Sequence, residues 1–144
     1  MRLQDLNQDP ATEKQLYGQW HMMFFMDQDC DKKCEEVVYT MRQIKTSFHK
    51  DSSRVSNILI HFDKNINQSF QEKIKTHYSN FERYYGDKAV FKKHLGTDAD
   101  ELMQKRIMFV VDPIGNVILK YDRSKTAKDI ISDFKRLLKA SQIG

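Results

Sequence analysis

The chain has 144 residues, of which 40% are hydrophobic and 11% aromatic, enough to bury one core and too few for two typical domains. Its formal net charge of +4 arises from 24 basic and 20 acidic residues that are interspersed along the chain. Because no long basic block and no recognised module accompany this mild charge, the sequence argues against nucleic acid as a partner. No segment approaches the ~20 apolar residues of a membrane-spanning helix, and the polar N-terminus is unlike a signal peptide, so we expect a soluble domain.

The N-terminal segment differs in pattern from the rest of the chain. Residues 1–15 are polar and show no sustained periodicity, so we expect a tail or linker followed by one domain at residues 16–144. Trp20 to Met26 are almost continuously apolar, which predicts a strand covered on both faces of a sheet. The polar loop Asp27–Asp29 ends this strand.

A helix is predicted from Asp31 to about Phe48. Apolar residues recur there at spacings of three and four, which is the pattern of one face of an amphipathic helix. This stripe comprises Cys30, Cys34, Val37, Val38, Met41, Ile44 and Phe48.

Cys30 and Cys34 are the only cysteines and are the candidate redox pair. Side chains four apart on a helix lie roughly 5–6 Å apart at Cβ, and a disulfide needs about 3.5–4.5 Å, so a small local adjustment closes a reversible disulfide. The helix N-terminus and the adjacent Lys32 and Lys33 favour a thiolate at Cys30, whereas the nearby aspartates oppose it. Two inert thiols or a fixed structural disulfide are the alternative, although so short a loop gives little entropic stabilisation.

The middle of the chain contains a second strand and further helices. Val55 to Phe62 is apolar and β-branched, which predicts a strand. A helical stripe then follows, made of Ile66, Phe70, Ile74, Tyr78 and Phe81. We expect a short extended piece at Phe81–Tyr85, a short helix from Asp87 to about His94, and an acidic loop at Thr97–Glu101.

The C-terminal third carries the clearest hairpin. Ile107–Val111 and Val117–Tyr121 are predicted strands, and the turn Asp112–Gly115 between them has proline and glycine where turns favour them. Thr126 is predicted to cap a last helix, with Asp129 three residues on as in a capping box. The core stripe of that helix is Ile130, Ile131, Phe134, Leu137 and Leu138.

This order of elements is that of an α/β, thioredoxin-like fold with a central mixed sheet, and the chain resembles the Sco/SenC family. Three features carry the resemblance: the aromatic strand leading into CDKKC from Cys30, the segment ILIHFD from Ile58, and the hairpin MFVVDPIGNVILKYD with the helix after it. Sco proteins help to mature the binuclear copper centre of cytochrome c oxidase. The resemblance therefore implies a redox or copper function, with an oxidase subunit or a redox protein as partner.

Two departures from the family concern the site itself. Prolines typically follow the family's two cysteines, whereas Asp31 and Glu35 stand there in this chain. The family also binds copper with a histidine four residues before the core of the hairpin's first strand, and this position holds Gln104. A carboxamide is a poor ligand for Cu(I), so the copper site that the resemblance implies, with Cys30 and Cys34 as metal ligands, lacks its third member.

Other residues are weaker candidates for the missing ligand. Met103 offers a soft sulfur, but a methionine just before a strand is more often part of the core. His94 is better explained as a side chain that interacts with the dipole at a helix C-terminus. His61 is most simply a histidine at the edge of the core with one ring nitrogen hydrogen-bonded. His21, His49 and His77 have no ligand spacing.

These patterns favour two functions, and a third is a weaker alternative. The first is a thiol–disulfide oxidoreductase of cytochrome c oxidase assembly, in which Cys30 attacks and Cys34 resolves a mixed disulfide. The second is a copper chaperone that uses both cysteines and a substitute third ligand, and the third is a degenerate domain that only binds a partner. The helical continuation CEEVVYTMRQIK resembles membrane-anchored Sco-like proteins of proteobacteria, so we expect a periplasmic location, tethered in the full-length protein by an anchor that this chain lacks.

Overall fold

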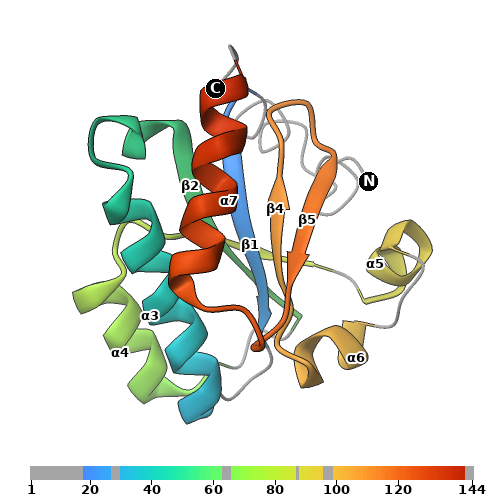
Figure 1. Ribbon diagram of the computed structural model, residues 1–144. Helices are drawn as coiled ribbons and strands as arrows, with labels where there is room; N and C mark the ends of the chain where they lie inside the picture. Colours follow the sequence, from blue (N-terminus) through green and yellow to red (C-terminus); the bar gives the residue numbers. More distant parts are fainter. Residues whose placement is uncertain (1–17, 27–29, 63–65, 87, 96–98, 142–144) are drawn as a thin grey trace.

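The computed structural model describes residues 18–26, 30–62, 66–86, 88–95 and 99–141. Their strands form one five-stranded mixed sheet in the order β3-β2-β1-β4-β5 (Figure 1). The strands are β1 Trp20–Met26, β2 Val55–His61, β3 Glu82–Tyr85, β4 Met108–Val111 and β5 Val117–Tyr121. Strands β1, β2 and β3 run parallel, while β4 pairs antiparallel with both β1 and β5. This sheet confirms the predicted thioredoxin-like fold of one α/β domain.

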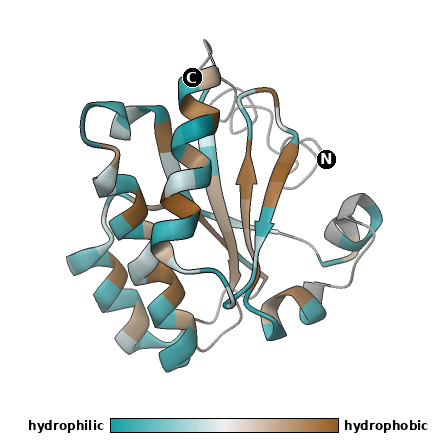
Figure 2. Ribbon diagram, in the orientation of Figure 1, coloured by the Kyte–Doolittle hydropathy of each residue, from teal (hydrophilic) through white to brown (hydrophobic). Residues whose placement is uncertain are grey.

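Helices connect and cover the strands. They are α3 Lys32–Ser47, the 3-10 helix η1 His49–Arg54, α4 Gln68–His77, α5 Lys88–Leu95, α6 Ala99–Gln104 and α7 Ala127–Ala140. In Figure 1, α3, α4 and α7 lie over one face of the sheet, and α6 lies by the lower ends of β1 and β4. The colours in Figure 2 show apolar residues gathered on the strands and on the helix sides that face them.

The sheet separates two hydrophobic clusters. The cluster on the side of α3, α4 and α7 includes Phe24, Met41 and Phe134, each at most 1% exposed. The cluster on the other side includes Phe25 and Phe109, together with the α6 residue Leu102. Alternate residues of β1 face opposite clusters, which explains why this strand is apolar without interruption.

Three helices begin as capping chemistry requires. The side chain of Asp31 accepts a hydrogen bond from the backbone N–H of Cys34, and Thr126 accepts one from the N–H of Asp129. The second cap is the one predicted for the last helix. Asn67 caps α4 by accepting from the backbone N–H groups of Ser69 and Phe70.

Three details of the predicted helices differ from the structure. Cys30 belongs to the predicted helical stripe, yet it precedes the N-cap Asp31 and lies outside α3. Residues from Ala99 onward form α6 instead of an acidic loop, because Asp100 and Glu101 in a first turn complement the helix dipole. The predicted helical stripe extended to Phe81, but α4 ends at His77, so Tyr78 and Phe81 lie beyond the helix.

Some predicted features fall on residues outside those described. They are the tail at residues 1–15, the loop Asp27–Asp29 and the start of the short helix at Asp87.

Candidate functional site

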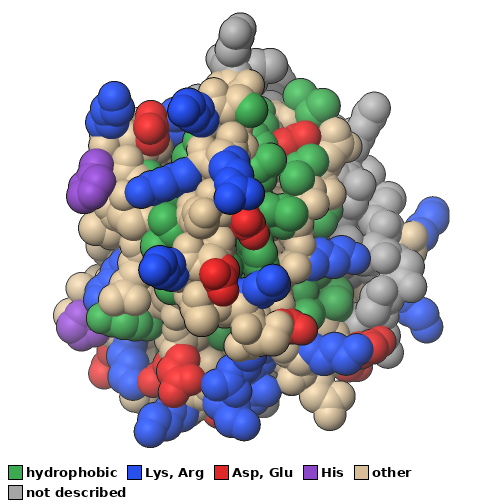
Figure 3. Space-filling view, viewed as in Figure 1, with side chains coloured by type: hydrophobic (Ala, Val, Ile, Leu, Met, Phe, Trp, Pro, Cys, Tyr) green, Lys and Arg blue, Asp and Glu red, His purple; other side chains and the backbone are tan. Residues whose placement is uncertain are grey.

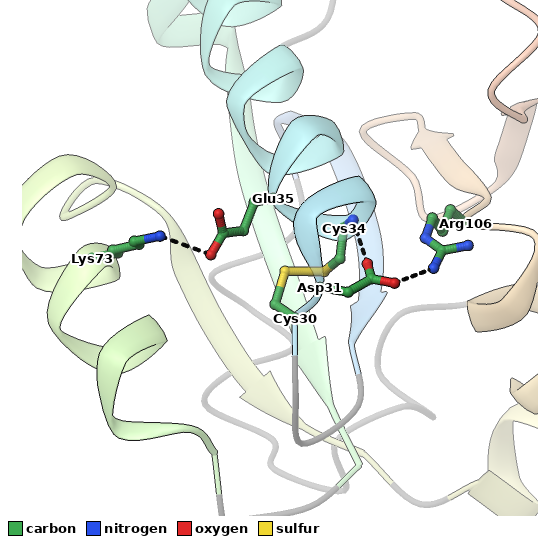
Figure 4. Close-up of a disulfide and its surroundings, with 6 residues drawn as sticks. All are labelled: Cys30, Asp31, Cys34, Glu35, Lys73 and Arg106. Carbon is green, nitrogen blue, oxygen red and sulfur yellow. Dashed lines mark hydrogen bonds and ion pairs between the residues drawn. A yellow bond between two sulfur atoms is a disulfide. The ribbon is translucent and has the colours of Figure 1, made fainter.

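The two cysteines meet where β1 leads into α3. Cys30 and Cys34 are joined by a disulfide, with their Cα atoms 5.2 Å apart (Figure 4). The Cys34 residue is 8% exposed and belongs to the core beneath α3, whereas Cys30 is only partly buried against the same core. The predicted pairing is therefore present, and the more exposed cysteine is the one outside the helix.

Asp31 stands between the cysteines and caps the helix. Its Oδ1 accepts from the N–H of Cys34 at 2.8 Å, and its Oδ2 pairs with Arg106 Nη2 at 2.5 Å. The Cys34 hydrogen bond, followed by the hydrogen bond from Arg106, lowers the pKa of the Asp31 carboxyl below its usual value. The carboxylate is therefore charged at neutral pH, and the charge that opposes a thiolate is offset by a neighbouring cation.

Arg106 contacts Asp31 from a segment 75 residues further along the chain. It lies between α6 and β4 with a φ of 53°, in the left-handed region that non-glycine residues seldom adopt. Its backbone N–H donates to the carbonyl of Met103, and its Nη1 donates to the carbonyl of Gln104. These bonds hold the guanidinium on the connection that faces α3.

Glu35 is the second acidic residue beside the cysteines, and it too is paired with another element. Its Oε1 lies 2.9 Å from Lys73 Nζ on α4. Figure 4 shows the two ion pairs on opposite sides of the disulfide. Sequence reasoning found both acidic residues but missed Arg106 and Lys73, because nothing in their local patterns points to the disulfide.

A cavity of about 390 Å³ opens beside the disulfide at the end of β1. Its apolar walls come from Phe24, Phe25, Met26 and Met103, and Cys34 lines it as well. Polar groups of Asp31, Asp100, Gln104 and Arg106 complete the lining. The structure thus brings Gln104 and Met103, both singled out from the sequence, to the same cavity as Cys34.

The histidines lie elsewhere in the described part of the chain. His61 is fully buried in β2 and accepts at Nε2 a hydrogen bond from Arg83 Nε, 3.1 Å away, which confirms one satisfied ring nitrogen. His21 contacts Ser56, and His49 and His77 are exposed. The side chain of His94 is outside the described set.

Whether the site could bind copper depends on the ligand atoms available near the two cysteines. Within the described ranges, no three residues of the His, Cys, Asp and Glu types cluster as a metal site. Both oxygens of Asp31 are engaged, and the guanidinium of Arg106 places a positive charge beside the pair. The described residues around the disulfide therefore do not fit the Cys-Cys-His copper site that the resemblance implied.

The surface and the helices carry little further functional signal. Figure 3 shows basic and acidic side chains interspersed on the face that α7 crosses, as the composition indicated. None of the helices in the described segments combines the length and the apolar character that crossing a bilayer demands.

The fold and the disulfide between β1 and α3 define a thioredoxin-like domain with a CxxxC pair. A family model described as a transmembrane-like, thioredoxin-like C-terminal domain matches residues 20–141, and the chain belongs to this family. No curated protein shows significant similarity to the chain.

Solved structures of Sco proteins share the fold. The copper-bound ScoI of Arabidopsis thaliana has a TM-score of 0.68 at 14% identity, covering 89% of each chain. A SCO1/SenC family lipoprotein from Bacillus anthracis has a TM-score of 0.66 at 20% identity, covering 87% of this chain and 84% of its own. BsSco, described as having a disulfide switch and as a member of the Sco family of cytochrome c oxidase assembly proteins, has a TM-score of 0.64 at 17% identity, covering 85% and 81%. The resemblance to Sco/SenC proteins is thus confirmed for the fold.

Proposed function

We propose that this domain is a thiol–disulfide redox protein that acts through Cys30 and Cys34. The observation that carries the proposal is the disulfide itself, which joins a partly exposed cysteine to a buried one at the N-terminus of a helix, beside an open cavity. The helix N-terminus stabilises a thiolate at this place, and exposure decides which sulfur a partner reaches first.

The exchange proceeds through a mixed disulfide. A partner thiolate attacks the sulfur of Cys30, a new S–S bond forms, and the electron pair of the old bond leaves on the sulfur of Cys34. A second thiolate then attacks the mixed disulfide, which releases the partner as a disulfide and leaves both cysteines reduced. In the opposite direction, Cys30 attacks a partner disulfide and Cys34 resolves the intermediate.

Reactivity of the separate thiols tests this assignment. Each single variant, Cys30→Ser and Cys34→Ser, is alkylated under pseudo-first-order conditions, and the wild type is equilibrated across a glutathione series. We expect the thiol of Cys30, present in Cys34→Ser, to react faster. Faster reaction of Cys34, or a wild-type pair that does not oxidise and reduce reversibly, would remove the redox function and leave a partner-binding domain.

The setting of the reaction is part of the same proposal. A disulfide persists in an oxidising compartment, so we place the domain in the periplasm. The resemblance to Sco/SenC proteins supports a tether to the inner membrane. The partner is a protein with a cysteine pair, either a redox protein or a cytochrome c oxidase subunit. Trapping with Cys34→Ser, which cannot resolve the mixed disulfide, would identify it, and capture of only cytoplasmic proteins in the native host would contradict the location.

Copper binding is a second candidate, favoured by the sulfur atoms around the cavity. Met26, Met103 and Cys34 all line it, and thioether and thiolate sulfurs suit Cu(I). Reduced protein is titrated anaerobically with Cu(I) against a competing chelator. We expect Met103→Leu to weaken binding and Gln104→His to strengthen it, and equal affinity in all three proteins would exclude this role for the loop.

A further inference from the structure

The carboxylates beside the disulfide are each paired with a cation from a distant element. Asp31 pairs with Arg106, which is 75 residues away in the chain, and Glu35 pairs with Lys73, 38 residues away (Figure 4). The two pairs differ in exposure, because the Arg106 side chain is 23% exposed and that of Lys73 is 47% exposed. Arg106 is therefore the better shielded of the two cations.

Asp31 presents a conflict between folding and chemistry. Its carboxylate caps α3 through the N–H of Cys34, and this cap stabilises the helix that carries the second cysteine. The same negative charge lies beside the disulfide, on the residue that follows Cys30, where it repels an attacking thiolate and the thiolate that leaves. A neutral cap such as asparagine would avoid the repulsion, but this chain has an aspartate at the position.

The position of Arg106 answers this conflict. Its guanidinium is held by its own loop through Gln104 and by the left-handed backbone at residue 106, so it does not depend on Asp31 alone for its place. It also lines the cavity that Cys34 faces. A thiolate that approaches the disulfide therefore meets a carboxylate that is already paired with a cation instead of an uncompensated one.

We propose that Arg106 is a specificity-determining residue that cancels the charge of Asp31 and thereby admits anionic thiolates to the Cys30–Cys34 disulfide. This inference rests on the proposed redox function, and it predicts that thiols with a negative charge near their sulfur are accepted as partners. Lys73 has the same relation to Glu35, with a weaker effect because solvent screens that more exposed pair.

The test is the rate at which small thiols of different charge reduce the oxidised protein. The probes are mercaptoethanesulfonate, 2-mercaptoethanol and cysteamine, whose thiolate forms carry net charges of minus two, minus one and zero. Rates are expressed per thiolate and measured at low salt. We expect Arg106→Gln to slow the sulfonate about twofold to fivefold, 2-mercaptoethanol less, and cysteamine least.

Matched variants separate charge from structure. Asp31→Asn/Arg106→Gln removes both charges, keeps an oxygen at the cap, and should restore the wild-type order of rates, as should Arg106→Lys. Lys105→Gln is the control, because it removes one positive charge from a different ion pair, the one between Lys105 and Glu101. The Lys105 side chain is 62% exposed, and its replacement should leave the rates unchanged. In 1 M salt, where the Debye length falls to about 3 Å, the differences among thiols should largely disappear.

The outcomes distinguish this inference from the function on which it rests. Equal slowing of all three thiols in Arg106→Gln, or a double variant that stays slow for the sulfonate, would show a structural effect of Arg106 and overturn the inference while the redox function stands. A wild-type disulfide that none of the thiols reduces would overturn both.

Discussion

Acidification should destabilise the protein through His61. This histidine is fully buried in β2, and its Nε2 accepts from Arg83, so it must be neutral with its proton on Nδ1. Burial, followed by the positive charge of Arg83, lowers the pKa of His61 from 6.5 to about 4. Protonation would place two cations side by side at a buried site.

The size and sign of the effect follow from linkage. In the unfolded chain the histidine titrates near 6.5, so between pH 6.5 and 4 the unfolded state binds more protons and the free energy of unfolding falls as pH falls. Each pKa unit corresponds to about 1.4 kcal/mol, which gives about 2 kcal/mol between pH 7 and 5 and at most about 3 kcal/mol in all. Above pH 6.5 this contribution is fully present.

Urea unfolding of the oxidised protein at pH 7 and pH 5 measures the effect. His61→Gln offers Arg83 an oxygen acceptor without a titrating group, so its free energy of unfolding should lose about 2 kcal/mol less than the wild type over this interval. His77→Gln, at an exposed histidine at the end of α4, is the matched control and should behave as the wild type. The same pH dependence in wild type and His61→Gln would refute the reasoning.

Two further predictions concern the stability of α3 and α7. The substitution Asp31→Ala removes the acceptor for the N–H of Cys34 and should lower the free energy of unfolding by about 1 kcal/mol. Asp31→Asn keeps an oxygen acceptor and should lower it less. Equal losses for the two variants in urea unfolding would exclude capping as the cause. Phe134 is fully buried on α7, with ring centroids of Trp20 and Phe48 at 5.7 and 5.1 Å, so Phe134→Ala should cost about 3–5 kcal/mol. A loss below about 1 kcal/mol in thermal or urea unfolding would contradict the packing described.

The local patterns of the sequence determined most of the elements. The continuous apolar run at Trp20–Met26 predicted a strand buried on both faces, and the structure places it at the centre of the sheet. The cap at Thr126 and the proline–glycine turn before Val117 were also visible, because caps and turns depend on residues within a few positions of each other. The CxxxC spacing predicted the disulfide for the same reason.

The surroundings of the disulfide were decided by the tertiary structure alone. Nothing near Arg106 or Lys73 in the sequence relates them to Cys30, since the ion pairs that they make join elements far apart in the chain. Their partners Asp31 and Glu35 looked like an obstacle to thiolate chemistry when read locally, and the structure shows each beside a cation. Side chains of this kind meet only after the sheet has placed α3 between α4 and the connection to β4, because the position of a charge in space depends on packing and not on sequence spacing.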